Sequence, residues 1–441
     1  MNLASDWALP ILWAQQQAID FDTTILFPWL PYTAFKWLLW LALGFFGIFP
    51  GFVAYMVWGE RKVAARFQDR IGPNRVGPLG LLQPIADPIK LLTKEDIVPT
   101  AADRWVHLLA PVLILVSAFL VLAVIPFGVG LAPVNLPSGL IYLVAVSGMS
   151  PLGIFLAGWS SRNKYSLLGA MRSVAQLVSY EVPQVLATVP VVLWAGSLSL
   201  VTIFEKQLEL GWFILSPPGL VSFGILMIAS IAEVNRTPFD LPEAESEIIA
   251  GYHTEYSGMR FGLFFLAEYL SVFGVSCLGT VLFLGGGTVL PFLEFPADMI
   301  GLKTTSYVLV NAILLSVFFA KVAGFIFVMF WIRATLPRMR VDRLMNFAWK
   351  YLVPLSIVNI LASAVWFECY IRSSKPFVLF GTRLQFWGLP MNWIISSFWT
   401  LLILVPAYLL ILAVNRREQL ALAKAPITAA LPPVRAAAAV H

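Results

Sequence analysis

Charged residues and cysteines are both scarce in this sequence of 441 residues, and each shortage excludes a class of protein. Only 12% of the residues are charged, against roughly 25% in ordinary soluble domains, whereas 59% are hydrophobic. Two cysteines cannot form a zinc site or hold an iron–sulfur cluster, which takes about four thiolates, and three histidines are a poor set for haem. The composition therefore predicts a membrane protein without a metal redox centre of its own, and nothing in it suggests nucleic-acid binding.

Runs of about 20 apolar residues predict an all-α, polytopic membrane protein with nine transmembrane helices. The expected helices are Phe35 to Trp58, Trp105 to Phe127, Leu140 to Trp159, Val174 to Leu198, Trp212 to Glu233, Met259 to Leu284, Ser306 to Trp331, Trp349 to Trp366 and Met391 to Val414. No stretch between them is long enough to bury a core of its own, so we expect one integral-membrane domain. Its parts are a partly interfacial N-terminal extension (1–34), a main membrane domain (35–366), a C-terminal extension with the ninth helix (367–415) and a disordered tail (416–441).

Basic residues predict the orientation, because Lys and Arg gather in cytoplasmic loops. Eight follow the first expected helix, three the third and five the seventh, whereas the fourth and sixth loops hold only Lys206 and Lys303. We therefore expect the N-terminus outside and the polar loops in the cytoplasm. A ninth helix also returns Arg416, Arg417 and Lys424 to the basic side.

The first inside loop combines tight turns with an amphipathic stretch. Its glycines and prolines between Gly72 and Gly80 mark turns, and apolar residues recur at roughly helical spacing from Leu81 to Leu92, beside Asp87 and Lys90. We expect a short amphipathic helix in the membrane interface. A solvated basic loop is the alternative for this loop taken alone, and its glycine pattern matches no nucleotide-binding fingerprint.

Carboxylates inside expected helices are the second signal. Glu181 lies about 10 Å inside the fourth apolar run, and Glu268 lies about ten residues into the sixth, near mid-bilayer. A carboxylate there is expensive, so each is expected to face a partner, a cavity or water. With Glu60 and Glu233 they form a set suited to a proton relay, for which Arg236 and Lys321 are candidate counterions.

The third inside loop is acidic, which the positive-inside rule does not call for. After Pro238 a helix would bring Asp240, Glu243 and Glu247 onto one face, with Glu245 close by. Like charges so placed repel, so in a low-dielectric cavity we expect them to share protons. The alternative is a solvated acidic loop.

Five runs, all in the same order, resemble the H subunit of bacterial NADH:quinone oxidoreductase and its counterpart, mitochondrial NADH dehydrogenase subunit 1. These runs are Glu60-Arg61-Lys62, Gln68 to Arg75, Ser179-Tyr180-Glu181, Ala232 to Leu241 and Ala267-Glu268-Tyr269. The likeness covers about Phe35 to Trp366. The family has eight spans, so the N-terminal extension and the ninth helix exceed its pattern.

The resemblance implies a complex I subunit of the bacterial inner membrane whose loops close a quinone chamber. Electrons would arrive from an iron–sulfur subunit, so this chain would bind ubiquinone or menaquinone as substrate but no flavin or metal. Its partners would be the hydrophilic quinone-site and iron–sulfur subunits, small membrane subunits and antiporter-like subunits. By motif, Arg61, Arg70, Arg236, Asp240, Glu243, Glu245 and Glu247 would face the chamber, and Glu60, Glu181, Glu233 and Glu268 would begin a proton path.

Two other functions stay open from the sequence. The anchor subunit of a membrane-bound hydrogenase or ferredoxin-linked complex shares these loops without needing a quinone, although the fuller motif from Gln68 to Lys90 favours the quinone enzyme. An autonomous secondary transporter would use Lys321 and the glutamates as an ion site, but the sequence shows no paired repeat of interrupted helices.

Overall fold

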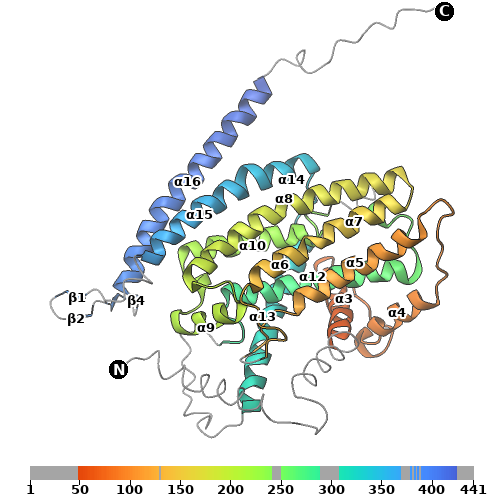
Figure 1. Ribbon diagram of the computed structural model, residues 1–441, viewed down its shortest axis with the longest axis horizontal. Coiled ribbons are helices and arrows are strands. Elements are labelled where there is room, and N and C mark those ends of the chain that lie inside the picture. Colours follow the sequence, from red (N-terminus) through yellow and green to blue (C-terminus); the bar gives the residue numbers. More distant parts are fainter. Residues whose placement is uncertain are drawn as a thin grey trace, which may run out of the picture.

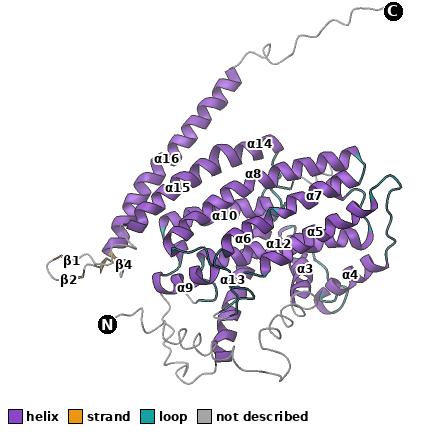
Figure 2. Cartoon of the chain, viewed as in Figure 1, coloured by secondary structure: helices purple, strands orange, loops and turns teal. Residues whose placement is uncertain are grey.

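The computed structural model describes residues 48–128, 131–240, 250–288, 307–368 and 391–424, with four two-residue strands between residues 378 and 390. The α-helices are α3 (Ile48–Phe67), α4 (Gln83–Thr93), α5 (Arg104–Leu122), α6 (Gly139–Ser147), α7 (Met149–Ser160), α8 (Lys164–Ala195), α9 (Leu200–Leu210), α10 (Pro217–Glu233), α12 (Gly258–Phe283), α13 (Tyr307–Thr335), α14 (Val341–Phe347), α15 (Val353–Trp366) and α16 (Met391–Lys424). A π-helical turn (Ala348–Leu352) joins α14 to α15, and 3-10 turns lie at Pro78–Gly80, Phe213–Leu215 and Gly251–His253. Figure 1 shows α5, α7, α8, α10 and α12 side by side as a bundle, with α16 extending away from it, and Figure 2 shows that helix dominates the described chain.

The strands are short and contribute little to the architecture. Strand β1 (Val378–Leu379) pairs antiparallel with β2 (Thr382–Arg383), and β3 (Gln385–Phe386) pairs antiparallel with β4 (Leu389–Pro390). The expected all-α, polytopic fold is therefore confirmed.

Seven helical segments are long and apolar enough to cross a membrane in the part of the chain that the structure describes. They are Arg104–Leu122, Gly139–Ser160, Lys164–Ala195, Gly258–Phe283, Ile313–Thr335, Val341–Trp366 and Ser396–Arg417, and they match seven of the nine expected helices. The fifth expected helix is the shorter apolar α10. The first lies partly outside the described residues, but from Ile48 onward it is helical and continues past Trp58 to Phe67.

Local sequence explains where helices α8 and α10 begin and where α8 ends. Helix α8 begins where the Asn163 side chain accepts a hydrogen bond from the Tyr165 amide at 3.0 Å, and it ends at Gly196, whose φ of 66° suits a left-handed cap. Helix α10 begins in the same way, because the Ser216 hydroxyl accepts from the Gly219 amide and Pro217 occupies the first helical position. Both helices therefore begin at a residue whose side chain caps the first turn.

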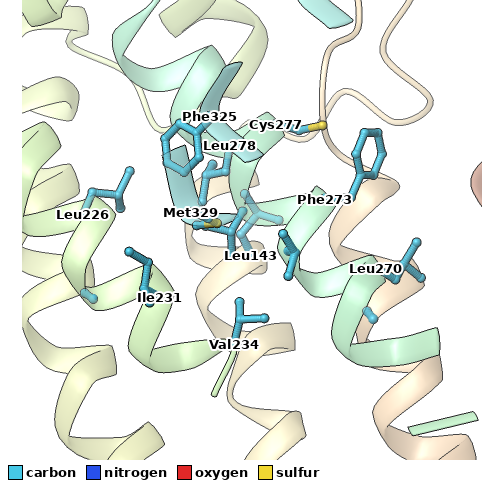
Figure 3. Close-up of a cluster of buried hydrophobic side chains, with 14 of the residues drawn as sticks. Leu143, Leu226, Ile231, Val234, Leu270, Phe273, Cys277, Leu278, Phe325 and Met329 are labelled. Atoms are coloured by element: carbon cyan, nitrogen blue, oxygen red, sulfur yellow. The ribbon is translucent and has the colours of Figure 1, made fainter. Parts of the chain in front are cut away.

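The core is an apolar cluster to which α12 contributes most, together with α5, α8, α10 and α13. Figure 3 shows Leu226 and Ile231 of α10 beside Leu278 of α12, with Phe325 and Met329 of α13 close by. All are at least nine-tenths buried. Packing of this kind holds α10, α12 and α13 in fixed positions relative to one another, and so positions the polar residues on and next to them.

Helix α16 confirms the ninth expected helix as a long apolar segment, and it lies along α15 (Figure 1). Ser396, Thr400 and Leu404 are the buried residues on one side of α16, and the Asn415 side-chain amide donates to the Lys350 carbonyl at 3.0 Å. Small and polar side chains allow this close helix contact. Many apolar residues on the remaining surface of α16 are exposed.

Two described helices had no counterpart in the predicted pattern. Helix α9 lies in a connection expected to be a plain loop, and α14 precedes the eighth expected helix. Each is too short to register in a search for runs of about 20 apolar residues. The amphipathic helix expected after the first span is confirmed as α4, with Ile85, Ile89 and Leu92 exposed along it.

Candidate functional site

Two carboxylates and two arginines meet at the junction of α3, α12, α13 and the turn after α10. Arg236 lies between the acids: its Nε is 2.9 Å from Glu268 Oε1 and its Nη1 is 3.4 Å from Glu60 Oε1. Arg333, near the end of α13, pairs with the same Glu60 oxygen. We call Glu60, Arg236, Glu268 and Arg333 the ion cluster. Its formal charges balance, as buried charges generally require.

An aromatic ring and a tight turn hold Arg236 in place. Its guanidinium lies 4.2 Å from the centre of the Tyr269 ring, a cation–π contact. Asn235 adopts a φ of 52°, so the chain reverses directly after α10, and the Arg236 amide donates back to the Ile231 carbonyl at 3.2 Å. The turn therefore aims Arg236 at α3 and α12 instead of letting it continue along α10.

Gln176 of α8 fastens the same turn from the other side. Its fully buried amide nitrogen donates to the carbonyls of Ala232 and Phe239, each at 2.7 Å. Two bonds from one side chain span the whole reversal from α10 to Asp240. Asp240 is half-buried and marks the end of this described segment.

Glu233, at the end of α10, and Glu181, on α8, lie outside the ion cluster. The Gln184 amide donates to Glu233 Oε2 at 2.6 Å, which ties α8 to the end of α10. Glu181 is half-buried on α8, and its Oε1 approaches the backbone of Gly148, where an added Cβ would lie 3.3 Å from it. A side chain at Gly148, which lies between α6 and α7, would therefore crowd the Glu181 carboxylate.

A cavity of about 70 Å³ joins the two groups of acids. Glu233, Asn235 and Glu268 line it together with four serines, Ser117, Ser147, Ser150 and Ser271. Space of this size with several polar partners suits a few water molecules. Water and serine hydroxyls in such a cavity can carry protons between Glu268 and Glu233.

The first inside loop has its own ion pair. Arg61 Nη1 lies 2.8 Å from Asp87 Oδ2 on α4, and the Gln83 amide donates to the other Asp87 oxygen at 2.7 Å. Arg61 is half exposed and Arg70 is exposed, and neither has an ion pair within the ion cluster among the described residues. The predicted chamber residues Glu243, Glu245 and Glu247 lie outside the described residues.

A second polar group joins the three inside loops, and we call it the loop hub. The His107 ring stacks on Tyr256 with centroids 3.9 Å apart, and the Tyr256 hydroxyl lies 3.4 Å from the Ser160 hydroxyl. Arg260 bonds His107 Nδ1 at 3.0 Å and pairs with Asp96 at 2.9 Å. The end of the first loop, the second loop and the start of α12 are thereby held together.

Burial shifts the pKa of Tyr256 in the loop hub and of the nearby His253. It raises the pKa of the Tyr256 phenol to about 12 and lowers the pKa of the His253 imidazole to about 3. His253 lies among the rings of Tyr252, Phe261 and Phe264. It is therefore a neutral core residue at physiological pH, in line with a structural histidine.

Lys321 lies elsewhere in the bundle. Its Nζ donates to the backbone carbonyls of Leu284, Gly286 and Thr288, and among the described residues it contacts no carboxylate. The ion cluster thus takes its second cation from Arg333. The sequence offered no sign of this, because an arginine at a cytoplasmic helix end already satisfies the positive-inside rule.

Comparison with known proteins identifies the family. The family described as NADH dehydrogenase matches residues 40–364. The chain belongs to this family. It is 47% identical over 351 residues to the H subunit of NADH-quinone oxidoreductase from Brevibacillus brevis, which covers 79% of this chain and 96% of that protein. The H subunits from Geobacillus kaustophilus (49% identity, 72% of this chain, 90% of the relative) and Dehalococcoides mccartyi (50%, 72% and 84%) are similarly close.

The family match covers most of the chain and leaves α16 outside it. The ion cluster, the cavity and the loop hub all lie within residues 40–364, whereas α16 follows the matched range. The chain is therefore a multi-pass membrane subunit of the NADH-quinone oxidoreductase type. Among the described residues, no group of three or more His, Cys, Asp or Glu side chains could hold a metal ion.

Proposed function

We propose that this chain forms the membrane part of a quinone chamber and couples quinone reduction to proton translocation through the ion cluster. The observation that carries the proposal is Arg236, which is buried and shared between Glu60 and Glu268 beside a cavity fit for water. A shared counterion makes the proton affinities of the two acids depend on each other.

The coupling step follows from that sharing. A negative charge that develops in the chamber on quinone reduction attracts the Arg236 guanidinium and weakens its pairing with Glu268. At a separation of about 4 Å, a unit charge pair is worth about 4 kcal/mol at an effective dielectric of about 20. Glu268 then binds a proton, and the cavity passes it to Glu233, which Gln184 holds in place. Glu60 keeps Arg333 throughout.

The chamber itself is assigned by motif. Arg61, Arg70 and the acidic group Asp240, Glu243, Glu245 and Glu247 would line it, with the reducing electrons supplied by a hydrophilic iron–sulfur subunit of the same complex. The substrate would be ubiquinone or menaquinone, and antiporter-like subunits would receive the protons beyond Glu181. We infer an inner-membrane orientation with the loop hub in the cytoplasm, because the basic residues gather on that side.

The test compares quinone reduction and proton pumping in complexes that carry Glu268→Gln, Glu233→Gln or Glu181→Gln. Each change keeps the size of the side chain and removes its proton, so NADH oxidation with a diminished proton gradient is expected. Glu95→Gln is the matched control, because Glu95 is an exposed acid outside the cluster. If the three variants pump as the control does, the assigned path is wrong.

A further inference from the structure

Lys321 occupies a cage of backbone oxygens. Its Nζ donates to the carbonyls of Leu284, Gly286 and Thr288 at 2.5 to 2.8 Å, and it lies 4.0 Å from the centre of the Trp212 ring. An ammonium has three N–H donors, whereas a neutral amine has two. Three carbonyl acceptors and an aromatic face therefore define a site for a positive charge.

The backbone around Lys321 is built to form this cage. Gly285 and Gly286 both have positive φ, 64° and 55°, so the chain folds back after α12 and turns its carbonyls inward. Gln207 of α9 fixes the fold from two sides, by accepting from the Gly285 amide at 3.0 Å and donating to the Val281 carbonyl at 2.6 Å. The Trp212 indole donates to the Thr288 hydroxyl at 2.8 Å.

Between the cage and the ion cluster lies a layer without charge. Helix α12 carries no charged residue after Glu268, and α13 carries none between Lys321 and Arg333, a span of about 18 Å along the helix. The layer is apolar and aromatic: Phe283 and Phe325 each contact Phe223 with ring centroids 5.7 Å apart. Val322 and Ile326, on the same stretch of α13, are also buried.

We propose that Lys321 is a tethered ammonium that fills a cation site and acts as an electrostatic barrier at the end of the bundle opposite the ion cluster. Its fixed charge repels a proton or a small cation that would otherwise cross from the cavity to the opposite end of the bundle. The apolar layer resists water, and the charge behind it resists the ion. This inference rests on the proposed function, because it supposes that protons reach the ion cluster.

The experiment compares Lys321→Gln with Lys321→Arg in the whole complex, reconstituted in phosphatidylglycerol and phosphatidylcholine vesicles. Glutamine keeps an N–H donor for the cage carbonyls but removes the charge, whereas arginine keeps the charge. A pH gradient is imposed without NADH, and its decay is followed with a fluorescent dye. The Gln variant should leak at least about fivefold faster, the Boltzmann factor for one unit charge about 18 Å away at an effective dielectric of about 20.

Chemical rescue provides the second measurement. Lys321→Ala leaves the cage open, and added guanidinium should slow the leak of this variant while leaving Lys321→Arg unchanged. Guanidinium keeps its charge and has no neutral form that would itself carry protons across the vesicle membrane. Equal gradient decay in the Gln and Arg complexes, or an Ala complex indifferent to guanidinium, would overturn the barrier. These outcomes are separate from a failure of the proposed function, which appears as undiminished pumping in Glu268→Gln while the leak of Lys321→Gln persists.

Discussion

Replacing Arg236 with methionine tests the ion cluster most directly. The side chain is only 9% exposed, and its contacts are Glu268 at 2.9 Å, Glu60 at 3.4 Å and the Tyr269 ring at 4.2 Å. Methionine fills similar space without charge. Removing one partner of a buried pair costs about 3–5 kcal/mol, because the other charge stays behind. The cation–π contact adds up to about 2 kcal/mol.

The expected loss of stability comes mainly from the Glu268 carboxylate, because Glu60 still pairs with Arg333. Adding Glu268→Gln to Arg236→Met removes the stranded carboxylate and should recover part of the stability. Residues in direct contact typically couple by about 0.5–3 kcal/mol. The double variant should therefore be more stable than Arg236→Met alone, although each single change is destabilising.

The assay is the thermal midpoint for disassembly of the purified complex, followed by native electrophoresis, in the wild type, both single variants and the double variant. Arg66→Met serves as the control, because Arg66 is an exposed arginine of α3. Additive effects of the two changes, or a stability of Arg236→Met equal to that of Arg66→Met, would refute the shared counterion.

Three further predictions concern residues outside the ion cluster. Burial lowers the pKa of His253 to about 3, below its unfolded value of about 6.5, so below pH 6.5 the unfolded chain binds more protons than the folded chain. The contribution of this residue to stability is therefore full above pH 6.5 and falls by about 1.4 kcal/mol per pH unit below it. The variant His253→Phe should lose less of its thermal midpoint than the wild type between pH 7 and pH 5. Gly219→Ala should reduce the assembled complex seen on native gels, because an added Cβ would collide with the Phe213 carbonyl oxygen. Gln184→Leu should slow proton pumping more than NADH oxidation by freeing the Glu233 carboxylate, and equal slowing of both rates would contradict that role.

The membrane spans were predictable because hydropathy is a local property of the chain. Apolar runs such as Met259 to Leu284 reproduce the helix α12 within a residue at each end. Helix α8 begins ten residues before its predicted start at Val174, because the cap at Asn163 and polar residues such as Arg172 extend the helix beyond its apolar part. Hydropathy marks where a helix meets lipid and not where the helix begins.

The sequence predicted several residues of the site but not how they meet in space. Glu60, Arg236 and Glu268 stand out as charges near or inside apolar runs, but their meeting depends on packing between elements far apart in the chain. Lys321 looked like a counterion because lysine in a span suggests a carboxylate, whereas three carbonyls satisfy it. Arg333 was overlooked because a charge at a helix end needs no partner to be explained.

The loop hub limits how the loops of this protein can change in length. Surface loops usually accept insertions easily, since their ends close at small entropic cost. Here the stacked rings of His107 and Tyr256, with Ser160 and Asp96 attached, draw three loops to a single point. A residue inserted between any of these anchors and its helix shifts two other loops as well. Variation in length should therefore collect on the distal parts of the loops, and a spliced tag should be tolerated near Arg75 but not near Asp96.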